Sequence, residues 1–494
     1  MSKRNREFIP AVAAVLAAAL MVGCGSGTGG GGRGGVEGSV VTFGTDAPIC
    51  DVESFSATIT SASLTPQSGG QSVPLITATS PATVDFARLT DFTNILTNSS
   101  GVPPGTYNQL KVTLTSPQLI TLNTLTSPPT AVSIPATLTA TSFTITISPA
   151  LVVTANTASG LTFDFNLRES LAVNNAGTVT GTVNPQITAT PTTPSGTTVG
   201  EATSLYGIAG TPSTTSLPSG FTGSFPLTLQ DGTGLTLTIL SNSSTVFEGD
   251  GVTTFANLAA NSFVEVDAIV NTSGQIIAQT VDSEEPTSAT NQKSAFLGEV
   301  INITQDGSGN ATGFSLLVDD EVPDLSGTIP LHAALNVALV STSNYFINLR
   351  PWNRQAFTFG PKTLGRAEKV AVFGVLGSGT PLTLTASQVF LRPGNVPGNF
   401  KALQAAGSDG KTGGFTLTPC GGLFGGHAIT VLTYPDTNFL GTGVSPLNEL
   451  TTASTLDTSG LLFYEQTSGA TSAGASWTAP TWVMQARGVH QLPN

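Results

Sequence analysis

The fold is decided by the stretch Gly223–Leu229, Gly-Ser-Phe-Pro-Leu-Thr-Leu, in which apolar and polar residues alternate. An Asp231-Gly232 turn follows it, and a second alternating run occupies Leu235–Leu240. A period of two is typical of a half-buried strand, and Asp-Gly favours a hairpin because Gly adopts positive φ. Further alternating runs continue downstream, so we expect an antiparallel β module over 205–285.

The same layout recurs twice further along the chain. Gly313–Val318 and Gly414–Thr418 correspond to Gly223–Leu229 and are followed by runs in the same order. We therefore expect divergent copies at 296–392 and 397–494, which makes two or three modules in all. Each is long enough to close into a small β-barrel, in the manner of an oligonucleotide/oligosaccharide-binding fold, which removes exposed strand edges.

The region 36–190 also has short alternating runs, such as Phe143–Ile147 and Leu161–Leu167, separated by turn residues. These runs predict an antiparallel β-sandwich, so the fold class expected for the whole chain is all-β. Helical spacing at Leu89–Leu96 predicts a short crossover helix. The Pro-, Thr-, Ser- and Gly-rich stretch at 191–204 predicts a linker.

Two regions resemble known bacterial families. In 36–190 the likeness is carried by four motifs in order, Gly44–Pro48, Leu89–Phe92, Pro104–Leu110 and Leu161–Phe165. This region resembles domain of unknown function 4382, and the module at 205–285 is similar to domain of unknown function 5666. The resemblance implies a protein of the cell envelope, and it supplies no catalytic residue.

The N-terminus predicts export and a lipid anchor. Basic residues and then an uncharged run make 1–23 typical of a signal peptide. Met21–Cys24 resembles a bacterial lipobox, in which the Cys24 thiol receives the lipid, and 24–35 is a Gly-rich tether. Because Gly25 follows the cysteine, we expect the outer membrane of a Gram-negative bacterium. The alternative is an ordinary cleaved signal with an incidental cysteine.

Charge and cysteine content limit the partners and the compartment. The chain has 17 Lys+Arg against 30 Asp+Glu, a net charge of −13, and no basic patch, which excludes nucleic acid as a partner. Only Cys50 and Cys420 remain besides Cys24. In an exported protein they either form a disulfide or stay as two thiols, and their spacing does not decide between the two.

Motifs of known enzymes are missing from the sequence. With three histidines and neither an HExxH nor a GxSxG pattern, we expect no enzyme activity and no cofactor. A Cys420–His427 pair is the one thiol-imidazole arrangement, and a Gly-rich hairpin explains it as well.

Two further groups are candidate binding residues. The acidic residues are calcium candidates because hard cations prefer oxygen ligands, although a solvated acidic turn needs no metal. The tryptophans are candidates for stacking on sugars, although strand aromatics usually pack in a core. The acidic candidates are Asp319, Asp320, Glu321 and Asp324, and the aromatic ones are Trp352, Trp477 and Trp482.

Together these features predict a lipid-anchored cell-envelope protein of β modules with a structural or binding role. Its expected partners are the membrane, through the anchor, and an envelope polysaccharide or a surface protein. A polysaccharide-binding or adhesion module is the alternative. A third class is an envelope hydrolase that uses dispersed carboxylates such as Glu265 and Glu299, since sequence alone does not give carboxylate distances.

Overall fold

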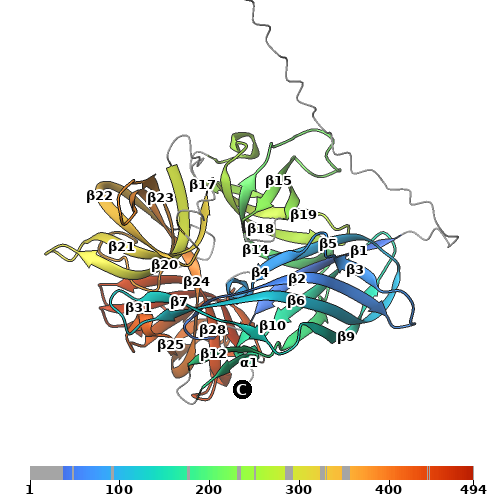
Figure 1. Ribbon diagram of the computed structural model, residues 1–494. Coiled ribbons are helices and arrows are strands. Elements are labelled where there is room, and N and C mark those ends of the chain that lie inside the picture. Colours follow the sequence, from blue (N-terminus) through green and yellow to red (C-terminus); the bar gives the residue numbers. More distant parts are fainter. Residues whose placement is uncertain are drawn as a thin grey trace, which may run out of the picture. The chain divides into compact units, whose positions relative to one another are not determined.

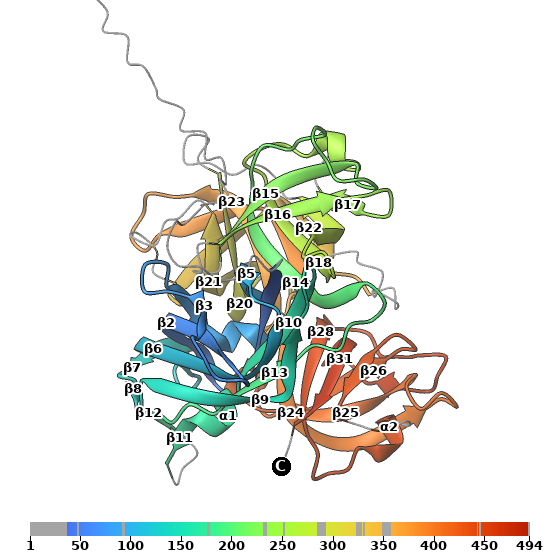
Figure 2. The ribbon, with the colours of Figure 1, turned by 90° about the vertical axis from the view of Figure 1, so that its right-hand side faces the viewer.

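The chain divides into two compact units, Met1–Gly35 and Val36–Asn494. The computed structural model describes residues 37–46, 49–90, 94–174, 178–230, 235–249, 252–283, 293–322, 329, 331–347, 357–441, 443 and 446–492. Strands make up 63% of the structure and helices 4%, which confirms the all-β prediction. Figure 1 and Figure 2 show these strands in two views. In the described part of the chain, no helix has the length and apolar character needed to span a membrane.

The first group of strands forms one sheet, which we call the N-terminal barrel. Its path is β3-β2-β6-β9-β13-β10-β1-β5, with β4 and β7 beside it. The long apolar faces of β2 and β6 line a core that holds the stacked rings of Phe86 and Phe165. β8, β11 and β12 form a separate three-stranded sheet. The elements of this region are β1 (Gly38–Asp46), β2 (Val52–Pro66), β3 (Val73–Ile76), β4 (Ala82–Asp85), η1 (Phe86–Thr90), β5 (Asn94–Val102), β6 (Gly105–Asn123), β7 (Thr130–Ile134), β8 (Thr137–Leu138), β9 (Ser142–Val153), β10 (Ala158–Phe165), α1 (Leu167–Ser170), β11 (Leu171–Val173), β12 (Val179–Val183) and β13 (Ile187–Pro191).

Two expectations for this region are wrong. The sandwich is replaced by a near-closed barrel, because Ser99 Oγ of β5 donates to the Leu75 carbonyl of β3 at 3.3 Å and joins the two ends of the sheet. The pairing is also mixed, with β1 parallel to β10. The helix expected at Leu89–Leu96 is absent from the residues described there, which form the end of η1 and the start of β5. Leu89 and Leu96 enter the same core from these two different elements.

The next group forms a five-stranded barrel, which we call the first small barrel. β14 pairs with β15 and β18, β15 pairs with β16, and β18 pairs with β19. A parallel pairing of β16 with β19 closes the ring, and β17 lies outside it on β19. The elements are β14 (Thr198–Ala209), β15 (Gly223–Leu229), β16 (Thr236–Ser241), β17 (Val246–Gly249), η2 (Phe255–Asn257), β18 (Phe263–Asn271) and β19 (Ile276–Ser283).

The same order of pairings recurs twice in the described residues. The second small barrel uses β20 to β24, closed by parallel β22 and β24. The third uses the end of β24 with β25, β26, β28 and β31, closed by parallel β26 and β31. The elements are β20 (Lys293–Gln305), β21 (Ala311–Val322), β22 (Ala334–Ile347), β23 (Lys369–Leu376), β24 (Thr383–Ala406), β25 (Gly413–Pro419), η3 (Gly422–Phe424), β26 (Ile429–Thr433), β27 (Asn438–Leu440), α2 (Pro446–Glu449), β28 (Thr455–Glu465), β29 (Gly469–Ala470), β30 (Ser476–Trp477) and β31 (Thr481–Gln491).

The connections between the barrels are short or continuous. The stretch 191–204, expected as a linker, contains the last residue of β13 and the first seven of β14. The boundary expected between 392 and 397 lies inside β24, whose first part completes the second small barrel and whose last part begins the third.

Buried side chains also join the barrels to one another. Phe43 of β1 belongs to the core of the first small barrel, and Leu122 of β6 belongs to a core with the third. Tyr206 and Phe263 of the first small barrel pack with Phe373 of the second. The described barrels are therefore packed together by shared cores as well as by chain connections.

Candidate functional site

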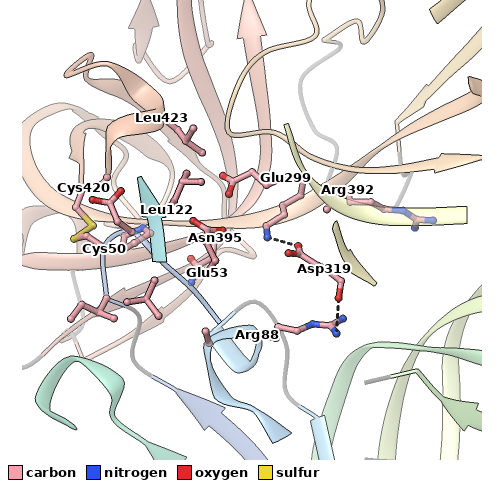
Figure 3. Close-up of a pocket in the computed structure, with 18 of the residues that line it drawn as sticks. Cys50, Glu53, Arg88, Leu122, Glu299, Asp319, Arg392, Asn395, Cys420 and Leu423 are labelled. Carbon is pink, nitrogen blue, oxygen red and sulfur yellow. Dashed lines mark hydrogen bonds and ion pairs between the residues drawn. A yellow bond between two sulfur atoms is a disulfide. The ribbon is translucent and has the colours of Figure 1, made fainter. Parts of the chain in front are cut away.

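A cavity of about 150 Å³ lies where four barrels contribute residues (Figure 3). Its wall mixes aliphatic side chains with a cluster of charged ones. The polar groups come from several elements, among them β2, η1, β20, β21, β23 and β24. The lining residues used below are Cys50, Asp51, Glu53, Arg88, Leu122, Tyr206, Leu297, Glu299, Asp319, Lys369, Arg392, Asn395, Cys420, Leu423 and Phe424.

A disulfide forms one side of the cavity. Cys50 and Cys420 are bonded, although 370 positions separate them in the sequence. Beside the bond, the backbone N–H of Gly422 donates to Asp51 Oδ1 at 3.1 Å. The question that the sequence left open is thereby answered in favour of the disulfide, which joins the N-terminal barrel to the third small barrel.

Asp319 collects positive charge on the opposite side. Lys369 Nζ donates to Asp319 Oδ2 at 2.8 Å, and His332 Nδ1 lies 3.9 Å from Asp319 Oδ1. Burial alone would raise the pKa of Asp319, but the charges of Lys369, His332 and Arg88 outweigh burial and lower it. Asp319 is therefore held as a carboxylate.

Glu53 and Glu299 bring two more carboxyl groups to the cavity. Glu299 of β20 is the cross-strand partner of Lys369 in β23, and Glu53 is the second residue of β2 in the N-terminal barrel. Burial, and then the negative charge of Glu299, raises the pKa of Glu53 well above its usual range, while Lys369 acts in the opposite direction. Glu53 therefore holds its proton more tightly than an exposed glutamate does.

Asn395 adds an amide to the same wall (Figure 3). Both its Oδ1 and its Nδ2 are inaccessible to solvent, and neither has a hydrogen-bond partner among the described residues. Buried amide groups are nearly always hydrogen-bonded, because leaving one unsatisfied costs about 1–3 kcal/mol. Asn395 is thus available to a ligand in the cavity.

Arg392 reaches away from the cavity into a buried ion cluster. Its Nη1 lies 2.5 Å from Glu265 Oε2 and 3.4 Å from Asp282 Oδ2. Glu265 and Asp282 belong to β18 and β19, whereas Arg392 belongs to β24. The cluster ties the first small barrel to the second.

Two of the four calcium candidates bind cations of the protein itself. Asp319 holds Lys369, and Asp320 Oδ2 accepts from Arg88 Nη2 at 3.3 Å. Glu321 is buried beside them, and Asp324 lies outside the described residues. Within the described ranges, no group of three or more His, Cys, Asp or Glu side chains is arranged to hold a metal ion.

The tryptophan candidates lie in different surroundings. Trp477 is buried, its Nε1 donates to the Thr467 carbonyl, and its ring packs on Phe357, so it has no free face for a sugar. Trp482 is half-buried and packs against Tyr464. Trp352 and the lipidation candidate Cys24 lie outside the described residues.

The residues considered for catalysis are not brought together. Cys420 is in a disulfide and has no thiol to offer His427, which is exposed near Trp482. Of the two dispersed carboxylates, Glu299 lines the cavity, but Glu265 is buried on Arg392 outside its lining.

The sequence did not point to Glu53, Lys369 or Asn395. Each is an isolated polar residue within or beside a strand, and only pairing between distant strands gathers them. An Asn flanked by Gly394 and Val396 in the middle of a strand is the one local signal, because an amide there must find a partner or a ligand.

The comparisons with known proteins agree with the sequence on two regions. Residues 37–180 match the family described as Domain of unknown function (DUF4382). Residues 223–282 match Domain of unknown function (DUF5666). Both resemblances expected from the sequence are confirmed, and the DUF5666 match falls within the first small barrel. Most of the cavity wall on the N-terminal side belongs to the DUF4382 region.

No curated protein matches the chain. Among solved structures, the chain is similar to "drosophila Unr CSD456", at 9% identity over 59% of this chain and 98% of that chain, with a TM-score of 0.14. A likeness at this TM-score carries no argument about fold or function.

Proposed function

We propose that this protein is a lipid-anchored cell-envelope protein whose β modules have a structural or binding role without catalysis. The observation that carries the proposal is the Cys50–Cys420 disulfide. Structural disulfides persist in oxidising compartments outside the cytoplasm, which agrees with the basic and apolar N-terminal signal and the Met21–Cys24 lipobox. Lipid at Cys24 would hold the barrels at the outer membrane.

Thiol trapping in the producing cell tests export. We expect full-length chain to resist alkylation until a reductant is added, because Cys50 and Cys420 are bonded. A matched chain that lacks residues 1–23 should stay in the cytoplasm and be alkylated directly. Direct alkylation of both chains would contradict export.

Lipid labelling tests the anchor separately. The full-length chain should incorporate radiolabelled palmitate and sediment with outer membranes, and Cys24→Ala should lose both properties. Cys50→Ala is the matched control, because it also removes one cysteine but leaves the lipobox intact. Equal membrane attachment of the Cys24→Ala chain would overturn the anchor.

The barrel topology favours polysaccharide binding as a second candidate. In each small barrel the strands pair in the cyclic order first-second-third-fifth-fourth, and the third and fifth are parallel. This order supports an oligonucleotide/oligosaccharide-binding-like fold, and the net charge of −13 disfavours nucleic acid as its ligand.

Cosedimentation with insoluble envelope polysaccharide tests this candidate. Half-buried Trp482 is the candidate stacking residue, so Trp482→Ala should weaken retention about tenfold, since stacking contributes about 1–1.5 kcal/mol. Phe346→Ala, which removes a 40% exposed aromatic of the second small barrel, is the control. Equal retention of both variants and the parent would exclude Trp482 from a glycan site.

A further inference from the structure

A second cavity lies on the first small barrel, and we call it the groove. Its volume of about 500 Å³ is within the range of about 300–1,000 Å³ that is typical of small-ligand sites. Thr236 and Thr238 of β16 line it and alternate along the strand with Leu237 and Ile239, which belong to the barrel core. Side chains of a strand point alternately to its two faces, so the outer face of β16 forms part of the groove.

Two turns of the same barrel also line the groove. The turn at 216–218 precedes β15, and beside it Ser213 and Ser224 exchange backbone hydrogen bonds of 2.8 and 2.9 Å. The turn between β18 and β19 carries Gln275, whose backbone N–H donates to Asn271 Oδ1 at 3.0 Å. These bonds within the protein hold both turns in place before any ligand binds.

The N-terminal barrel contributes to the groove as well. Asn98 of β5 belongs to the lining. The backbone N–H of Ala158 in β10 donates to the Thr272 carbonyl at 2.7 Å, and this bond fixes the turn between β18 and β19 against the N-terminal barrel. The groove therefore includes residues from two barrels, and ligand sites often lie between such modules.

The described lining residues of the groove carry no charge. Some bear hydroxyl or amide groups, and the others are aliphatic residues and glycine. A saccharide combines the same two kinds of group, because its hydroxyls donate and accept hydrogen bonds whereas its C–H groups are apolar. Polar groups that a ligand covers need partners, so this lining suits a saccharide better than a hydrocarbon. The polar lining residues are Asn98, Ser216, Ser224, Thr236, Thr238 and Gln275.

Gln275 is the lining side chain whose orientation is best defined. Its Oε1 accepts a hydrogen bond from Asn271 Nδ2 at 2.8 Å. Among the described residues, none accepts a hydrogen bond from Gln275 Nε2. The bond from Asn271 therefore fixes the amide and leaves the two N–H donors of Nε2 for another acceptor.

We infer that the groove binds a short, uncharged saccharide. Gln275 Nε2 donates to a sugar oxygen, and the hydroxyls of Ser224 and Thr238 add further hydrogen bonds. Leu217 and Leu240 contact the C–H groups of the sugar.

Other classes of ligand fit the groove less well. An acidic saccharide would find no cation among the described lining residues, and the net charge of −13 would oppose its approach. A cationic ligand would find no carboxylate in the described lining. An aliphatic chain would cover the hydroxyl and amide groups without giving them hydrogen bonds, which costs free energy.

This inference rests on the binding role in the proposed function and names its ligand class, but its test does not involve the anchor. Calorimetry reports on the groove, whereas thiol trapping and palmitate labelling report on export and lipid. Trp482 belongs to β31 of the third small barrel and is not part of the groove. Each of these tests can therefore fail while the others succeed.

The experiment is a calorimetric titration of the purified full-length chain in a detergent without a sugar headgroup. The neutral probes are the trisaccharides of glucose, mannose, galactose and N-acetylglucosamine. The trisaccharide of galacturonic acid is the acidic probe, and n-hexanol is the aliphatic one. We expect saturable binding of at least one neutral trisaccharide and none of the acidic or aliphatic probe.

Two substitutions with matched controls test the groove itself. Thr238→Trp places an indole on the outer face of β16 and should weaken binding at least about tenfold, whereas Thr188→Trp, at an exposed position of β13, should change affinity less than about twofold. Gln275→Glu keeps an oxygen that accepts from Asn271 but removes the Nε2 donor, so it should weaken binding about tenfold. Gln279→Glu, at an exposed position of β19, should change affinity less than about twofold.

Several results would overturn the assignment. One is the absence of saturable heat from every neutral trisaccharide, and another is equal binding of the acidic or the aliphatic probe. A third is unchanged affinity in both Thr238→Trp and Gln275→Glu, which would place the saccharide elsewhere on the protein. An equal loss in Thr188→Trp would mean that any added indole disturbs binding. Where Thr238→Trp fails to fold, the comparison of Gln275→Glu with Gln279→Glu decides the question.

Discussion

Replacing Arg392 with methionine should destabilise the protein, because it removes the guanidinium that pairs with the buried carboxylates of Glu265 and Asp282. Arg392 is 3% exposed and Glu265 is 0% exposed, and Nη1 of the arginine lies between Glu265 and Asp282 at 2.5 and 3.4 Å. Methionine fills the space of the arginine stem but leaves both carboxylates buried without this cation. Breaking a buried ion pair from one side costs about 3–5 kcal/mol. The guanidinium also lies 5.6 Å from the Phe390 ring, a contact worth about 0.5–1 kcal/mol, which places the expected loss toward the upper end of that range.

Urea unfolding followed by far-UV circular dichroism measures this loss, with the disulfide intact in all chains. The matched control is Arg168→Met, which removes an exposed arginine of α1 and should cost less than about 0.5 kcal/mol. Adding Glu265→Gln to the Arg392→Met chain should recover part of the stability, because it removes one of the stranded charges. A loss below about 1 kcal/mol in Arg392→Met would refute the reasoning.

Three further predictions concern stability. Reducing the Cys50–Cys420 bond should lower the free energy of unfolding by about 2–5 kcal/mol, because the bond closes a loop of 370 positions. A Cys50→Ser chain is the control, and its free energy of unfolding should be the same with and without reductant. Gly200→Ala should cost about 1–3 kcal/mol in a urea titration, since the new Cβ would overlap the buried Phe43 ring. A neutral result would mean that the ring moves freely. Burial raises the pKa of Glu368 well above 4.5. The protonated side chain therefore contributes its full stabilisation below pH 4.5, and this contribution is lost as the pH rises through the raised pKa. The free energy of unfolding should fall by up to about 1.4 kcal/mol per pH unit in that range. Glu368→Gln should flatten this dependence, and an unchanged profile would exclude Glu368 as its source.

The local structure could largely be predicted from the sequence, whereas the pairing of strands could not. Alternation at Gly223–Leu229 correctly predicts β15, because a strand with one buried face must repeat every two residues. Alternation says which face is buried but not which strand lies alongside, so it did not reveal that Ser99 joins the ends of the N-terminal barrel. The helical spacing of Leu89 and Leu96 gave a wrong prediction for a related reason. These residues belong to two elements that contribute to the same core, and their spacing in sequence is also compatible with one face of a helix.

The cavity was harder to predict than the fold. Its polar residues come from positions 53, 299, 369 and 395, and no motif of fixed spacing connects them. Of these, the sequence singled out only Glu299, as a carboxylate for hydrolysis. The acidic cluster at Asp319 and Asp320 was noticed because it is contiguous, yet the structure gives both residues cations from distant segments, Lys369 and Arg88. The acidic run could therefore be recognised in the sequence, but only the folded structure shows which cations these carboxylates bind.

Closed barrels need some other means of fixing how they pack on one another. A ring of paired strands leaves few free edges, so neighbouring barrels meet through side chains, and apolar surfaces alone define direction poorly. We infer that the ion cluster of Arg392, Glu265 and Asp282 fixes the relative orientation of the first and second small barrels more than it adds to stability. An all-apolar replacement of these three residues should restore the free energy lost in Arg392→Met but should lower the yield of the correct Cys50–Cys420 bond after reduction and reoxidation. Full recovery of that yield would show that the apolar contacts alone align the barrels.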